Sequence, residues 1–159
     1  MSKSFENLAA IYAERSAEAA RNDIRALKGD KEGRHQEALL FRALANGQRI
    51  HASKALMLLR GRIGATDENL ASAAAEVEVT SEMLKAMSKL AATERAAPIE
   101  SSMIQFMKAA YSHSAKLKSV GKKDEAYHVC QICGFISSDG VPDRSPICHA
   151  VPQQFSAVE

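Results

Sequence analysis

The sequence predicts an all-α four-helix bundle made of two duplicated αα-hairpins, followed by a small metal-binding domain. Three observations support this fold class. Residues 5–120 are rich in Ala, Leu, Met, Glu, Lys and Arg, which favour helix. The segment 6–14 recurs 62 residues later as 68–76. Three cysteines stand near the C-terminus, in a segment punctuated by Gly and Pro.

Three breaks divide the helical region into four helices. The breaks are KGDKEG (28–33), RGRIGAT (60–66) and ATERAAP (92–98). Pro98 suits a first helical position, where its missing N–H costs no hydrogen bond. The expected helices are 5–28, 34–60, 67–93 and 98–119. A polar segment follows, so the predicted domains are a bundle at 1–120, a hinge at 121–126 and a small domain at 127–159.

The 62-residue shift aligns the two halves of the helical region. It places ENLAAIYAE over ENLASAAAE, and it places His51 on His113. It also places Glu14 on Glu76, so that a glutamate precedes each histidine by 37 residues. A repeat of this length indicates two αα-hairpins packed into one bundle, because neither hairpin can bury its apolar face alone.

Composition excludes several classes of function. The formal net charge is only +2 and no basic stripe is interleaved with aromatic residues, so we expect no nucleic-acid partner. The chain has no apolar run approaching about eighteen residues, so we expect no membrane span. The N-terminal MSKSFENLAAIYAERS carries charge where a signal peptide is apolar, so we expect a cytoplasmic protein.

The cysteines form an incomplete metal-binding pattern. Cys130 and Cys133 make a CxxC, and Ser145 stands three residues before Cys148, where a second CxxC would begin. In a chain without an export signal this pattern predicts metal ligation or redox chemistry rather than a disulfide framework. We therefore expect iron or zinc bound by the three cysteines.

The fourth ligand has three alternatives. Ser145 is our first choice because of its place in the pattern. His149 or His128 would make a Cys3His site, which zinc accepts readily. Water is the third possibility. Iron would carry electrons, whereas zinc has no redox chemistry and would be structural.

Together these features resemble the rubrerythrin family, which joins a ferritin-like diiron bundle to a rubredoxin-like domain. The most specific part is YHVCQICG followed by SPICHAVPQQF, and the segments NLAAIYAE and AEVEVTSEM are similar to the family's first and third metal-binding helices. The resemblance implies peroxide reduction at a diiron centre, with electrons supplied by the rubredoxin-like iron. It also implies a homodimer, with elements exchanged between the two chains.

The resemblance maps four metal-binding residues onto the helices: Glu14, His51, Glu76 and His113. Three positions that would supply carboxylates instead read Gln48, Val79 and Ala110. Two irons about 3.5–4 Å apart need more negative charge than two glutamates provide.

Three interpretations of the helical site stay open. They are a diiron site completed by Glu18 or Glu82, a single or weakly bound metal, and a metal-free core with relic Glu–His pairs. We favour the metal-free core. The predicted function is a non-haem iron redox protein that transfers electrons through its C-terminal site to or from a redox partner protein. The resemblance implies a peroxidase-type oxidoreductase, but the depleted diiron ligands argue against the family's peroxide reduction. The alternative is a non-catalytic scaffold or accessory subunit of a larger redox complex, with a structural zinc or a single iron.

Overall fold

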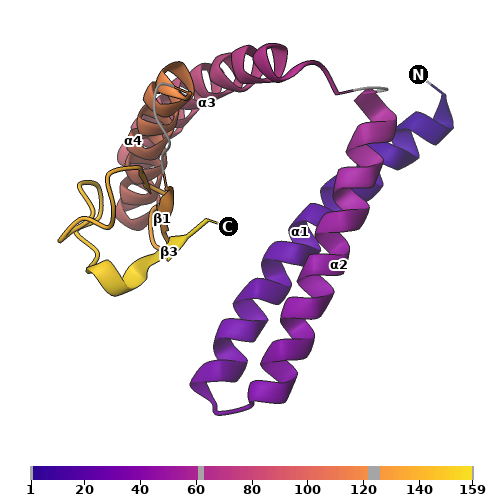
Figure 1. The fold of residues 1–159 in the computed structure, drawn as a ribbon, viewed down its shortest axis with the longest axis horizontal. Coiled ribbons are helices and arrows are strands. Elements are labelled where there is room, and N and C mark those ends of the chain that lie inside the picture. The colour runs from indigo at the N-terminus through magenta and orange to yellow at the C-terminus, as the bar shows by residue number, and fades with distance from the viewer. Residues whose placement is uncertain (1, 61–62, 122–125, 159) are drawn as a thin grey trace. The chain divides into compact units, whose positions relative to one another are not determined.

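The computed structural model describes residues 2–60, 63–121 and 126–158. Four helices come first: α1 (Lys3–Lys31), α2 (His35–Arg60), α3 (Thr66–Thr93) and α4 (Ala97–Ser119). A small sheet follows, made of β1 (His128–Cys130), β2 (Ile136–Ser137) and β3 (Phe155–Ala157), with the short 3₁₀ helix η1 (Pro152–Gln154) before β3 (Figure 1). The predicted fold class, helices followed by a small domain, is confirmed.

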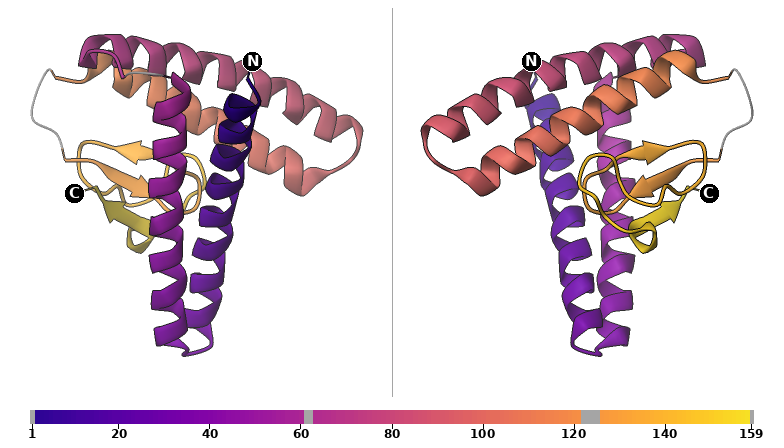
Figure 2. Two further views of the ribbon diagram at one scale, coloured as in Figure 1. Left: turned by 90° about the vertical axis from the view of Figure 1, so that its right-hand side faces the viewer. Right: turned by 90° about the vertical axis from the view of Figure 1, so that its left-hand side faces the viewer.

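The chain divides into two compact units, Met1–Gly64 and Ala65–Glu159. The first contains the α1–α2 hairpin, and the second contains the α3–α4 hairpin and the small sheet (Figure 2). The predicted division at 1–120, 121–126 and 127–159 stays a prediction, and residues 122–125 of the predicted hinge lie outside the described residues. None of the described helices combines the length and apolar character needed to cross a membrane.

Local chemistry explains where the helices begin and end. α1 runs three residues beyond its predicted end, and the chain turns at Gly33, whose φ of 71° is readily adopted only by glycine. The backbone N–H of Ala65 donates to the Glu68 carboxylate at 2.9 Å, which satisfies a polar group at the start of α3. Pro98 lies in the first turn of α4, as predicted.

Small residues form the contact between the two helices of each hairpin. In α1 the buried residues are Ala19, Asn22, Ala26 and Gly29, and in α2 they are Ala38, Ala45, Ala52 and Ala55. Their spacing of three, four and seven residues keeps them on one side of each helix. A Cβ added to Gly29 would lie 3.2 Å from the Cβ of Ala38, so the backbones approach closely there.

The larger apolar side chains lie outside these contacts. Ile24 and Ile50 in the first hairpin are 67% and 66% exposed, and Val79 and Leu90 in the second are 72% and 58% exposed. Each hairpin therefore buries mainly small side chains and leaves a wider apolar surface uncovered. This agrees with the expectation that a single hairpin cannot bury its apolar face.

The small sheet has the strand order β2-β1-β3, with both pairings antiparallel. Val129 of β1 stands opposite Ile136 on one side and Ser156 on the other. Among residues 126–158, only Cys130, Cys133 and Ser145 are fully buried. The interior of this domain therefore consists of the residues predicted to hold the metal.

Candidate metal centre

Two turns with the same hydrogen bonds form the candidate centre. In the first, which contains the CxxC, the Cys130 N–H donates to the Phe135 carbonyl at 2.9 Å, and the Cys130 carbonyl accepts from Gly134 N–H at 2.9 Å. In the second, the Ser145 N–H donates to the Ala150 carbonyl at 2.9 Å, and the Ser145 carbonyl accepts from the N–H of the residue after Cys148 at 3.0 Å. Ser145 is therefore the structural counterpart of Cys130.

The three sulfurs converge in the space between these turns. The Sγ atoms of Cys130, Cys133 and Cys148 all lie within 4.8 Å of one another. The Cys130 and Cys148 sulfurs are 3.7 Å apart, and the Cys133 sulfur is 3.4 Å from the Ser145 hydroxyl oxygen. A tetrahedral ion with metal–sulfur bonds of about 2.3 Å requires sulfur–sulfur edges of about 3.8 Å. The donor set therefore fits one tetrahedral ion.

The Ser145 hydroxyl is held inside the centre. Its side chain is completely buried, and its oxygen accepts from the backbone N–H groups of Ile147 at 3.3 Å and Cys148 at 3.4 Å. Backbone donors aimed at one oxygen favour a partial negative charge on it. The geometry thus supplies three sulfurs and one oxygen at the four corners, although the role of Ser145 as the fourth ligand stays a prediction.

The two histidines considered as alternative ligands lie differently. His149 is exposed, and its φ of 60° corresponds to the 76° of Gly134 in the first turn. His128 lies on β1 with a buried Nδ1 that has no hydrogen-bond partner among the described residues. Neither histidine joins the sulfur cluster in the part of the chain that the structure describes.

The surroundings shift the pKa values of two thiols in opposite directions. Burial raises the pKa of Cys133, and hydrogen bonds from Ser145 and the Phe135 backbone N–H offset part of that rise. Burial also acts to raise the pKa of Cys148. There, hydrogen bonds from Ser145, the Ala150 backbone N–H and the other thiols outweigh burial, so the pKa of Cys148 is lowered. Because thiolates are the metal-binding form, Cys148 is deprotonated for binding more readily than Cys133.

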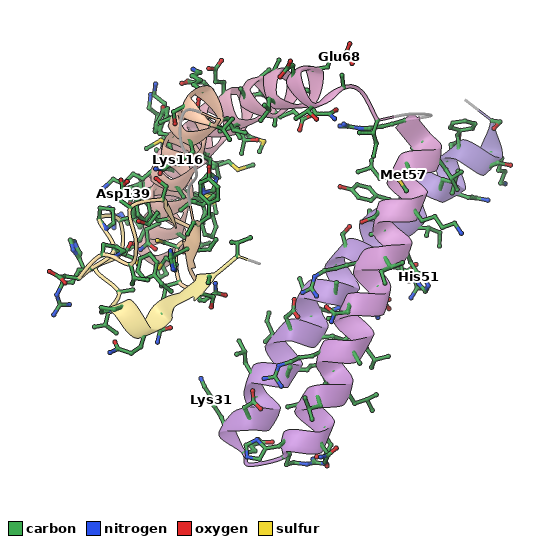
Figure 3. All side chains as sticks on the ribbon, viewed as in Figure 1. Lys31, His51, Met57, Glu68, Lys116 and Asp139 are labelled. Atoms are coloured by element: carbon green, nitrogen blue, oxygen red, sulfur yellow. The ribbon has the colours of Figure 1, made fainter. Side chains whose placement is uncertain are left out.

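In the first hairpin the candidate ligands do not form a cluster. Glu14 and His51 are exposed, and Figure 3 shows His51 projecting from the outer side of α2. Gln48 instead accepts from the Asn22 amide at 2.8 Å and donates to the Glu18 carboxylate at 3.2 Å. Glu18 also pairs with Arg15 at 2.7 Å. The sequence analysis did not identify Asn22 as a partner of Gln48. The feature that could have indicated it is a polar residue among the small residues that recur along one side of α1.

In the second hairpin, His113 contacts the first turn of the centre. Its Nε2 lies 2.8 Å from the Gly134 carbonyl oxygen, while Glu76 is exposed on α3. Lys116, one turn along α4, donates to the Ser138 hydroxyl. A groove of about 540 Å³ is lined by Glu76, His113 and Cys133 among others. No feature of the sequence indicated that His113 would contact the small domain.

Within each of the two hairpins, taken by itself, the described helices hold no group of three His, Cys, Asp or Glu side chains placed to bind one ion. Two helical hairpins followed by a two-turn cysteine centre define a class of protein, in which a ferritin-like helical region carries a rubredoxin-like domain.

The structure is similar to solved structures of nigerythrin, at 23% sequence identity over 99% of this chain and 88% of that chain. The TM-score is 0.54 for the mixed-valence state and 0.56 for the fully reduced, all-ferrous state. Nigerythrin is a rubrerythrin family member, so the resemblance is confirmed at the level of the fold. No protein-family model and no curated protein matches the chain.

Proposed function

We propose that the chain is a rubrerythrin-like non-haem iron redox protein that transfers single electrons through its C-terminal centre. The observation that carries this proposal is the matched pair of turns, which puts Ser145 where a fourth cysteine would stand. Iron held by thiolates exchanges one electron between its ferrous and ferric states. The nigerythrin structures are described as mixed-valence, partially reduced and all-ferrous, which supports iron over zinc here.

The residues of the centre have separate tasks in this proposal. The three thiolates neutralise the charge of the ion, and the burial of Cys130, Cys133 and Ser145 excludes water. Cys148 is partly exposed, so it gives electrons a short route to a redox partner protein. The CxxC pattern favours metal ligation over a disulfide framework, and we therefore place the protein in the cytoplasm.

Metal content tests this function directly. We expect the full chain, purified without added metal, to contain one iron per chain and to show a visible thiolate-to-iron charge-transfer spectrum. Elemental analysis with an optical spectrum measures both. One colourless zinc per chain would replace the electron-transfer function with a structural one, and about three irons per chain would indicate a working diiron bundle.

Two serine-to-cysteine variants test whether Ser145 is the fourth ligand. Ser145→Cys should shift the charge-transfer spectrum toward that of a four-sulfur site and tighten binding, because thiolate suits this tetrahedral site better than a hydroxyl. Ser156→Cys on β3 adds a thiol at an exposed position and serves as the control. If Ser145→Cys leaves the spectrum unchanged, Ser145 lies outside the coordination sphere.

A second candidate function is a non-catalytic scaffold or accessory subunit of a redox complex. The arrangement in the first hairpin favours it, because Gln48 is engaged with Asn22 and Glu18 while Glu14 and His51 are exposed. In that case the C-terminal centre would hold a structural zinc or a single iron. One zinc per chain in the metal analysis above would favour this second function, whereas one iron per chain agrees with both functions.

We further propose that the chain forms a homodimer with exchanged elements. The support is the apolar surface that each hairpin, taken by itself, leaves uncovered, including Ile24, Ile50 and Leu90. Light scattering on the full chain should give twice the 17.2 kDa mass of one chain. A monomer at micromolar concentration would contradict this assembly.

A further inference from the structure

The three thiols of the centre have different immediate partners. The Cys130 sulfur lies 3.7 Å from the Cys148 sulfur, whereas the Cys133 sulfur lies 3.4 Å from the Ser145 hydroxyl. A hydroxyl cannot form a disulfide. The Cys133 sulfur also lies within 4.8 Å of the other two sulfurs, but it is engaged with the serine hydroxyl, while Cys130 and Cys148 are in direct sulfur–sulfur contact.

Access to the thiols differs as well. Cys130 and Cys133 are 1% and 3% exposed, while Cys148 is partly exposed. A small oxidant arriving from solvent meets Cys148 first, because oxidation of cysteine follows the exposure of its sulfur. The Cys130 sulfur is in contact with that of Cys148 at 3.7 Å, and the Cys133 sulfur lies within 4.8 Å of it.

We propose that a peroxide oxidises Cys148 and Cys130 of the metal-free chain to a disulfide and leaves Cys133 as a free thiol. This chemistry goes beyond the proposed electron transfer, which uses the metal-loaded centre. It makes the C-terminal domain a site of peroxide modification whenever the metal has left.

The two steps balance in atoms and electrons. In the first, the Cys148 sulfur attacks one oxygen of hydrogen peroxide, an S–O bond forms, the O–O bond breaks, and the departing hydroxide takes a proton to become water. In the second, the Cys130 sulfur attacks the Cys148 sulfur, the S–S bond forms and the S–O bond breaks. The hydroxyl leaves as a second water with the Cys130 proton. The two sulfurs lose two electrons, and the peroxide gains two.

Formation of the disulfide requires only a small movement of the two sulfurs. A disulfide is about 2.0 Å long, so the Cys130 and Cys148 sulfurs must approach by about 1.7 Å from their separation of 3.7 Å. The new bond joins the same two turns that the metal joins, because Cys130 belongs to the first turn and Cys148 to the second.

The test uses the full chain. The protein is stripped of metal with a chelator under anaerobic conditions, treated with one equivalent of hydrogen peroxide and alkylated. We expect the free thiols to fall from three to one. Trypsin cleaves after Lys123 and Arg144, which separates a peptide containing Cys130 and Cys133 from a peptide containing Cys148. Mass spectrometry should find these two peptides linked, with the alkyl group on Cys133.

Two variants identify which two cysteines form the disulfide. Cys133→Ser should still give the linked peptides, and Cys130→Ser should lose most of the linkage. A disulfide within the peptide 124–144, equal linkage in Cys130→Ser, or oxidation of Cys148 beyond the sulfenic acid without linkage would each overturn the proposal. The metal content of the untreated chain is measured separately, so failure of the proposed electron-transfer function is distinguished from failure of this inference.

Discussion

Cys133→Ala is expected to abolish metal binding and to loosen residues 127–159, while the helical circular dichroism signal changes little. The side chains buried in this segment are Cys130, Cys133 and Ser145, so the domain has almost no apolar core beyond its candidate ligands. Structural zinc contributes on the order of 10–16 kcal/mol in domains of this kind, far more than the few aliphatic contacts can supply.

Ile132→Ala is the matched control. Ile132 stands between the two cysteines of the first turn but is 57% exposed, so its removal should leave the metal in place. Elemental analysis measures the metal, circular dichroism measures the helices, and limited proteolysis after Arg144 reports on the small domain. The His113 contact with Gly134 and the Lys116 contact with Ser138 should be lost with the domain. If the helical signal collapses as well, the small domain and the helices form one cooperative unit.

The helical region is expected not to sustain peroxide turnover. A diiron centre must neutralise four to six positive charges, as pairs of ferrous or ferric ions carry about that many. Glu14 and Glu76 would offer two negative charges, and the amide of Gln48 is occupied by Asn22 and Glu18. After anaerobic loading with ferrous iron and with an electron donor supplied, the full chain should reduce hydrogen peroxide little faster than free iron does.

Restoring the carboxylates provides the contrasting variant. Gln48→Glu, Val79→Glu and Ala110→Glu together should raise the iron bound by the helices toward two per chain. Val79 is 72% exposed and accepts the longer side chain, whereas Ala110 is 7% exposed and must make room for it. Any chain whose C-terminal centre has lost its metal would consume one equivalent of peroxide by oxidation of Cys130 and Cys148, so a first equivalent is subtracted before turnover is measured. Two tightly bound irons with rapid peroxide turnover in the unmodified chain would contradict this prediction and show that the chain is a peroxidase.

Features that depend on neighbours along the chain could be predicted from the sequence. The four helices begin and end within a few residues of their predicted bounds, because Pro98, Gly33 and the helix-forming composition act locally. The three metal-binding cysteines were also predictable, since the CxxC fixes two of them within one turn. The 62-residue repeat predicted that the helices would pair as hairpins.

The contacts between side chains distant in sequence could be known only from the folded chain. The sequence identified Gln48 as standing where the resemblance expects a carboxylate, but it did not indicate the hydrogen-bond partners of Gln48. These partners, Asn22 and Glu18, lie on the other helix of the hairpin, 26 and 30 residues away. His113 was paired with Glu76 by the repeat, yet it contacts the Gly134 carbonyl of the small domain. These contacts depend on packing between elements distant in sequence, and neither helical periodicity nor motif spacing encodes such distances.

The metal centre also combines a feature that the sequence predicted with features that only the folded chain shows. Spacing placed Ser145 three residues before Cys148, but the spacing alone left His149, His128 and water as alternatives. The fold gave His149 the left-handed backbone conformation that Gly134 has in the first turn and left its side chain exposed, while it buried the Ser145 hydroxyl beside Cys133. The physical reason is that the direction of a side chain follows from the backbone conformation of its turn, and that conformation is fixed only when the two turns close around a common centre.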